Sequence, residues 1–135
     1  MDTKIRAKVI MEVVGSPENH VNDVLNALIE KIASTKSYEL HKKKVFPTKK
    51  MDDKPLWSSF AEMEISYKDM ESIFGFCFDF MPSSVEILAP EELTLKERNI
   101  SNFVNDLLAR LHQYDMILKN IHAENVLLKR KLEKA

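Results

Sequence analysis

The sequence has few of the residues that make tight turns, disulfides or membrane spans. Its 135 residues include two glycines and one cysteine. We therefore expect few sharp turns and no internal disulfide. A single cysteine is typical of a protein from the reducing cytoplasm. No apolar run reaches the roughly 18–20 residues that a helix needs to cross a bilayer. The net charge of −1 indicates no general attraction to nucleic acid or to a membrane surface.

Signatures of catalysis and of cofactor or metal binding are also missing. The sequence contains no Cys-x-x-Cys or His-Glu-x-x-His motif, no acidic calcium loop and no glycine-rich phosphate loop. Two of the histidines, His112 and His122, are too far apart on one helix to share a metal. Cys77 falls on an apolar helical stripe without a base or cationic cluster beside it, so we expect a small buried side chain. The sequence predicts a protein that is not an enzyme and has no metal or cofactor.

Six segments in the first ninety residues have the periodicity of regular secondary structure. Four of them alternate apolar and polar residues, or are rich in strand-forming residues, and predict strands. The predicted strands are residues 4–14, 37–46, 57–66 and 84–89. Two others place apolar residues at helical spacing. The first helix is predicted from Pro17, with Ser16 as its N-cap, to between Ala33 and Thr35, and the second covers 67–80.

The order of these elements predicts a fold class. Strand, helix, strand, strand, helix, strand is the order of the ferredoxin-like α+β sandwich, βαββαβ, with a four-stranded antiparallel sheet and both helices on one face. We assign this domain to residues 1–90. Because a core of about 90 residues is modest, the domain would gain stability from oligomerisation.

Residues 91–135 predict a long C-terminal helix that acts as a heptad oligomerisation segment. Thr94 and Glu97 match a capping box at its start. From Ile100 onward, residues alternately four and three apart are apolar or aromatic in all cases but one, which is the pattern of a coiled coil. These seam residues are Ile100, Val104, Leu107, Leu111, Tyr114, Leu118, Ile121, Asn125, Leu128 and Leu132.

The seam predicts a homodimer of parallel helices. Asn125 is its one polar residue, at heptad position a, where a buried asparagine pairs with its copy and fixes the register. Glu124 would face Lys129 of a parallel partner, and Arg110 would face Asp115. Leucine at several a positions instead favours a tetramer, and antiparallel helices or a helix folded back on its own domain stay open as alternatives.

Charge is distributed unevenly along the chain. Residues 36–54 carry seven lysines, whereas residues 62–92 carry eight acidic residues against one lysine. Such runs are usually solvated faces. The candidate polyanion-binding residues are Lys42, Lys43, Lys44, Lys49 and Lys50. Aromatic residues lie nearby, and ferredoxin-like sheets can stack bases on exposed aromatic side chains, so an accessory protein that binds RNA or DNA is one alternative function.

A regulatory domain that senses a small ligand is the other alternative. Gly15, Ser16 and Pro17 join the first predicted strand to the first helix. This turn resembles the ligand loop of ACT-type regulatory domains, which share the predicted topology. The resemblance covers one turn and a strand order. Our main expectation is therefore an oligomeric interaction or regulatory module of the cytoplasm that dimerises through its C-terminal coiled coil and presents its α+β domain to a protein partner.

Overall fold

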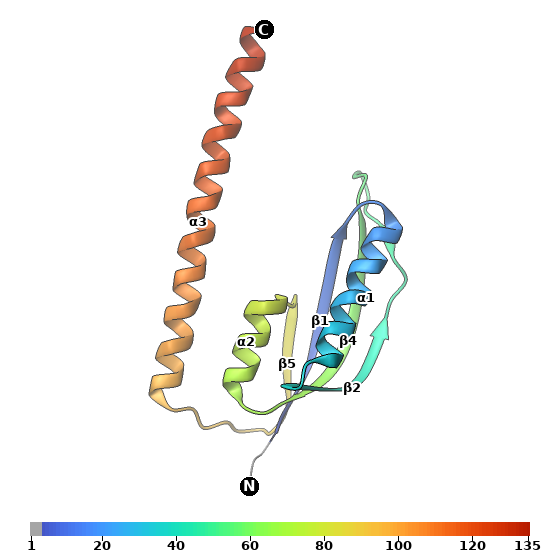
Figure 1. Cartoon of the computed structure of the whole chain (residues 1–135), viewed down its shortest axis with the longest axis vertical. Helices are drawn as coiled ribbons and strands as arrows, with labels where there is room; N and C mark the ends of the chain where they lie inside the picture. The colour runs from blue at the N-terminus through green and yellow to red at the C-terminus, as the bar shows by residue number, and fades with distance from the viewer. Residues whose placement is uncertain (1–3) are drawn as a thin grey trace. The chain divides into compact units, whose positions relative to one another are not determined.

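The computed structural model describes residues 4–135, which divide into two compact units at Thr94. The first unit is a mixed α+β domain (Figure 1). Its elements are β1 (Ile5–Gly15), α1 (Glu18–Ser34), β2 (Tyr38–Val45), β3 (Lys49–Lys50), β4 (Trp57–Tyr67), α2 (Met70–Phe80) and β5 (Ser84–Ala89). The second unit is one helix, α3 (Glu97–Lys134). The predicted α+β class and the long C-terminal helix are confirmed.

The strands form one five-stranded antiparallel sheet. Four of them lie in the order β2-β4-β1-β5, and the short β3 pairs with β4. The central pair, β1 and β4, is in register over eleven residues of each strand, from Ile5 opposite Tyr67 to Gly15 opposite Trp57. The sheet therefore has one strand more than the four that the sequence predicts.

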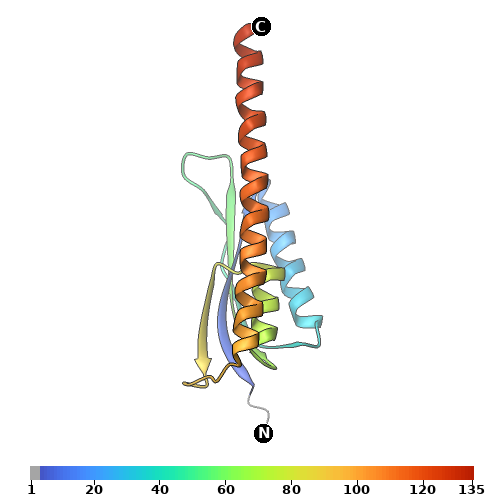
Figure 2. The same cartoon turned by 90° about the vertical axis from the view of Figure 1, so that its left-hand side faces the viewer.

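One face of this sheet forms the core. The alternation that predicts β1 and β4 places every second residue of each strand against the helices, and those residues are buried. Both helices contribute to the same core cluster, so α1 and α2 cover the same face (Figure 2). The buried residues of this cluster are Ile5, Ala7, Val9 and Met11 of β1, Ala61, Met63, Ile65 and Tyr67 of β4, Leu25, Ile29 and Ile32 of α1, and Ile73 and Phe76 of α2. We call the opposite surface of the sheet the open face.

Aromatic side chains fill the end of the core beneath α2. Phe76 is fully buried and meets Tyr38, Tyr67 and Phe80, with ring centroids between 5.0 and 5.4 Å apart. The rings of Tyr38 and Tyr67 meet edge to face, an arrangement that adds to the gain from burial alone. This cluster fixes α2 on the sheet.

The two predicted helix caps of α1 and α3 are wrong. The structure begins α1 at Glu18 with Pro17 as its N-cap, and α3 at Glu97 with Lys96 as its N-cap, and neither start has a side-chain cap hydrogen bond. Both helices therefore start one or more residues later than their capping signals indicate. Because a capping residue contributes only about 1 kcal/mol, a capping signal alone does not fix the residue at which a helix starts.

Helix α3 is continuous over 38 residues, and none of them is buried. At about 1.5 Å per residue it is roughly 57 Å long. Among residues 4–135, no helix combines the length and the apolar character that crossing a membrane requires.

Candidate functional site

The heptad seam of α3 lies on an exposed stripe. Nine of its ten residues are large apolar or aromatic side chains whose exposed fractions run from 36% at Leu107 to 75% at Leu132. The tenth, Asn125, is exposed as well. Isolated exposed apolar residues are common on protein surfaces, but a contiguous stripe of them marks an interaction surface. The structure therefore brings the predicted seam residues together on one helix face and leaves them exposed.

Further apolar side chains widen this stripe. Leu108 and Ile117, at positions e and g beside the seam, are 47% and 45% exposed. Met116 and Leu127 are also exposed, but their positions f and c lie on the side of the helix away from the seam. A stripe wider than a strict coiled-coil seam favours the association of more than two helices, or the packing of other residues against the first half of α3. The exposed apolar surface of α3 thus fits both the dimer and the tetramer that the sequence allows.

One of the predicted interhelical charges already has a partner within α3. The Nζ atom of Lys119 lies 2.7 Å from the Oδ2 atom of Asp115, four residues earlier on the same helix. Such an exposed pair stabilises a helix by only about 0.3–0.5 kcal/mol. A partner helix that brings Arg110 toward Asp115 can therefore replace it at little cost.

The second candidate surface is the open face, where cations and carboxylates alternate from strand to strand. Arg6 and Lys8 of β1 form ion pairs with Glu64 and Glu62 of β4, at 2.8 Å and 3.0 Å. The hydrogen bond from Lys8 to Glu62, together with the charge of that carboxylate, raises the pKa of the lysine. The acidic residues of β4 are therefore paired with cations from β1, which the uneven charge of the sequence does not reveal.

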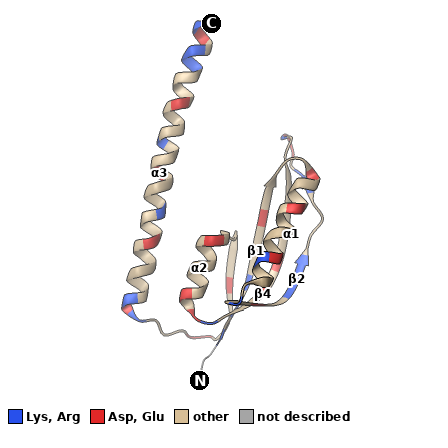
Figure 3. Ribbon diagram, in the orientation of Figure 1, with Lys and Arg blue, Asp and Glu red and all other residues tan. Residues whose placement is uncertain are grey.

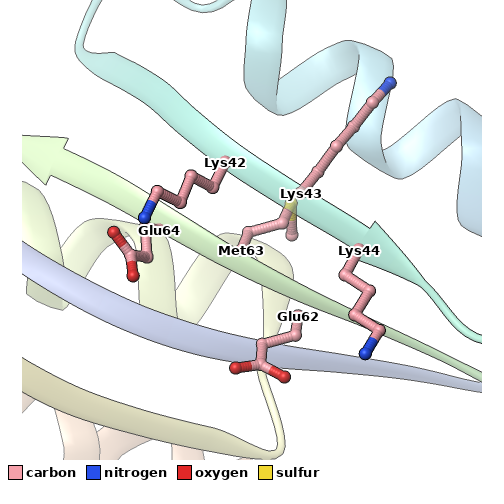
Figure 4. Close-up of a pocket in the computed structure, with 6 residues that line it drawn as sticks. All are labelled: Lys42, Lys43, Lys44, Glu62, Met63 and Glu64. Carbon is pink, nitrogen blue, oxygen red and sulfur yellow. The ribbon is translucent and has the colours of Figure 1, made fainter.

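The five candidate polyanion-binding lysines do not form one cluster. A bulge in β2 between Leu40 and Lys42 shifts the register, so that Lys42 lies opposite Glu64 and Lys44 opposite Glu62 on the open face. Figure 4 shows these two lysines on the side of Glu62 and Glu64, whereas Lys43 points to the other side, toward α1. Basic residues follow one another along β2 in Figure 3, but their side chains are divided between the two faces of the sheet.

The remaining two lysines of that set lie farther along the sheet. Lys49 pairs with Ser58 and Lys50 with Trp57, so neighbouring residues of β3 again point to opposite faces. The sequence predicts no strand between residues 46 and 57, whereas the structure has the short strand β3 beside β4. Only Lys42 and Lys44 are adjacent on the open face.

An apolar pocket adjoins Lys44, the nearer of these two lysines. It is lined by Ile10, Phe46, Phe60, Glu62 and Ser83. The N–H group of Phe46 donates a hydrogen bond to the carbonyl of Phe60, at 3.0 Å, which fixes the two aromatic residues side by side. The Nζ atom of Lys44 lies 4.9 Å from the ring centroid of Phe46, within the range of a cation–π interaction. We call these residues the aromatic pocket.

Other polar groups of the domain have structural partners. The Nε2 atom of His41 lies 2.6 Å from the Oγ atom of Ser66, a contact that anchors the bulge of β2 to β4. Burial raises the pKa of the Cys77 thiol, which is half-buried. Among residues 4–135, no three His, Cys, Asp or Glu side chains are grouped as a metal site requires. The turn at Gly15 leads into α1 without a side-chain cap.

Comparison with known proteins assigns the chain to a family. No curated protein and no solved structure is significantly similar to it. The model of the MJ0538 family matches residues 6–134, which covers both the α+β domain and helix α3. The chain therefore belongs to the MJ0538 family.

Proposed function

We propose that the protein is a non-enzymatic interaction module that forms a homodimer through α3 and presents its α+β domain to a protein partner. The observation that carries this proposal is the exposure of all ten seam residues on a helix without a single buried residue. A helix of this kind gains its stability from burying its apolar stripe rather than from helix propensity. The family match covers α3 as well as the α+β domain.

The energetic gain from pairing two such helices is large. Burial of one exposed leucine or isoleucine side chain stabilises an assembly by about 1.5–3 kcal/mol. Leu111, Leu118, Ile121, Leu128 and Leu132 are each more than half exposed in the single chain. Pairing removes these side chains from water on both helices, and this gain exceeds the translational and rotational cost of association.

We propose parallel helices for this dimer. Parallel pairing places Asn125 opposite its copy at position a, where the two amides can hydrogen-bond with each other. It also places Glu124 opposite Lys129, whereas antiparallel pairing separates the two asparagines. The wide apolar stripe in the first half of α3 is also compatible with a tetramer, which is the competing outcome when the oligomeric state is measured.

The fold of the presented domain supports a role in binding. We propose that residues 5–89 take the ferredoxin-like arrangement, because the strand order β2-β4-β1-β5 with all neighbours antiparallel corresponds to that topology when the short β3 is set aside. Such a sheet leaves one face uncovered by helices, and that face is available to a partner. We place the module in the reducing cytoplasm, since Cys77 is a free thiol.

A matched pair of substitutions tests the seam. Leu118 and Met116 are 64% and 65% exposed, but only Leu118 lies at a seam position. We expect Leu118→Glu to dissociate the dimer, because it buries a carboxylate against its own copy, whereas Met116→Glu leaves the dimer intact. Sedimentation equilibrium of both variants measures the difference. Equal dissociation by both substitutions, or by neither, contradicts a dimer held by this seam.

A further inference from the structure

We propose that the open face binds single-stranded nucleic acid, with bases on Phe46 and Phe60 and backbone phosphates on Lys42 and Lys44. This site is independent of the seam on α3. It combines the two features that sequence-tolerant binders of single strands use, which are aromatic side chains for base stacking and cations along the backbone path.

The ion pairs of the open face determine which charges remain for a ligand. Glu62 and Glu64 each form an ion pair with a cation of β1. No ion pair joins Lys42 or Lys44 to a carboxylate within residues 4–135. Both ammonium groups project from the same side of β2 (Figure 4). Lys42 and Lys44 therefore offer two neighbouring positive charges to a polyanion on this face.

The aromatic pocket lies directly beside Lys44, and Lys42 is the next residue on the same face of β2. Phe60 lies two residues before Glu62 in β4, on the same face of the sheet. Phe46 lies two residues after Lys44, and because β2 and β4 are antiparallel, the two rings lie at the same end of the face. Both rings are half-buried, so one part of each is packed while another part is accessible. The ammonium of Lys44 lies over one π face of Phe46, so a base that stacks on this face takes the place of the ammonium.

This geometry favours a single strand over other polyanions. A base can stack on an aromatic ring only when it is unpaired, so a duplex would engage the lysines but not the pocket. An acidic peptide would likewise bind the lysines and make no use of the two rings. The combination of two ammonium groups that form no ion pair within residues 4–135 with two adjacent aromatic rings matches a nucleotide chain, in which phosphates and bases alternate.

The experiment uses the full chain and a fluorescein-labelled oligothymidylate of about 12 nucleotides, with binding measured by fluorescence anisotropy at several salt concentrations. Three variants separate the contributions. Lys42→Gln combined with Lys44→Gln removes the proposed phosphate contacts, and Phe60→Leu removes one stacking ring. Lys43→Gln is the matched control, because it removes the same charge from the same strand but on the opposite face.

We expect the unmodified protein to bind, with an affinity that falls as salt rises. The double lysine variant should reduce the slope of log K against log salt by about 1.4, since each phosphate contact on a single strand contributes about 0.7. Phe60→Leu should weaken binding about tenfold. Lys43→Gln should change neither quantity, and circular dichroism confirms that each variant is folded.

Three results would overturn the site. The first is the absence of binding at about 50 mM salt, where electrostatic attraction is weakly screened. The second is an equal loss of affinity with Lys43→Gln, which would indicate attraction to charge anywhere on the domain. The third is displacement of the oligonucleotide by polyglutamate at equal charge concentration with no effect of Phe60→Leu, which would assign the lysines to an acidic protein partner.

Discussion

One carboxylate oxygen of Asp69 accepts two hydrogen bonds from Ser72. The backbone N–H and the hydroxyl of Ser72 both donate to the Oδ1 atom of Asp69, each at 2.8 Å. This is an N-cap at the start of α2, and its negative charge also favours the positive end of the helix. Of the three α-helices described in residues 4–135, only α2 has a side-chain cap at its first turn.

Removal of this cap should destabilise the domain. We expect Asp69→Ala to lower the free energy of unfolding by about 1 kcal/mol, because the N–H of Ser72 loses its acceptor. Urea unfolding followed by circular dichroism measures the change. Asp69→Asn retains an oxygen acceptor and should therefore keep most of the free energy of unfolding that Asp69→Ala loses. An unchanged midpoint for Asp69→Ala would mean that the packing of α2 alone fixes its start.

Tyr67 should make the domain less stable at high pH. Burial raises the pKa of its phenol, and its hydroxyl has no hydrogen-bond partner among residues 4–135. A tyrosine in the unfolded chain ionises near pH 10, while folded Tyr67 keeps its proton to higher pH. Above pH 10 the folded state therefore binds more protons than the unfolded state, and stability falls as pH rises.

The substitution Tyr67→Phe isolates this effect. At pH 8 we expect the variant to be at least as stable as the unmodified protein, because it removes a buried hydroxyl without a partner. Between about pH 9 and pH 11 its advantage should grow, since phenylalanine does not titrate. Parallel urea titrations at several pH values give the difference. A constant difference across this range would show that Tyr67 ionises equally in both states.

Asn125 should specify the register of the dimer at a cost in stability. We expect Asn125→Leu to raise the thermal midpoint, because an apolar residue at position a packs better than a buried amide, and to permit additional oligomeric states. Differential scanning calorimetry and light scattering measure the two effects. A single unchanged oligomer with an unchanged midpoint would place Asn125 outside a paired seam position.

Cross-linking distinguishes parallel from antiparallel helices. Parallel pairing brings position 125 of the two chains within the distance that a disulfide spans. In a Cys77→Ser background, Asn125→Cys should therefore form a covalent dimer on mild oxidation, and Met116→Cys should not. Non-reducing electrophoresis reads out the product. Equal cross-linking at both positions would indicate random collision rather than a parallel seam.

The core could be predicted from the sequence because its pattern is local. Alternation along β1 and β4 identifies every second residue from Ile5 to Met11 and from Ala61 to Ile65 as facing the core. The structure buries all of these alternate residues on one face of the sheet. The spacing of Val21, Leu25, Ile29 and Ile32 identifies the buried stripe of α1 in the same way. A period of two or of 3.6 residues fixes which side chains share a face.

The open face could be predicted only in part because its pairing is not local. The bulge beside His41 reverses the side of the sheet to which Lys42 and Lys44 belong, and no residue type in β2 requires a bulge. Alternation from Leu40 instead assigns both lysines to the core side. The ion pairs of Arg6 and Lys8 join residues more than fifty positions apart, and only the register of β1 on β4 determines them.

The central claim is that α3 joins two copies of the chain, and the molar mass of the unmodified protein in solution tests it most directly. Size-exclusion chromatography with multi-angle light scattering gives this mass without any assumption about shape. We expect twice the chain mass of 15.7 kDa, with dissociation only at high dilution. A mass of one chain at every concentration would contradict the account, and a mass of four chains would replace the dimer with a tetramer.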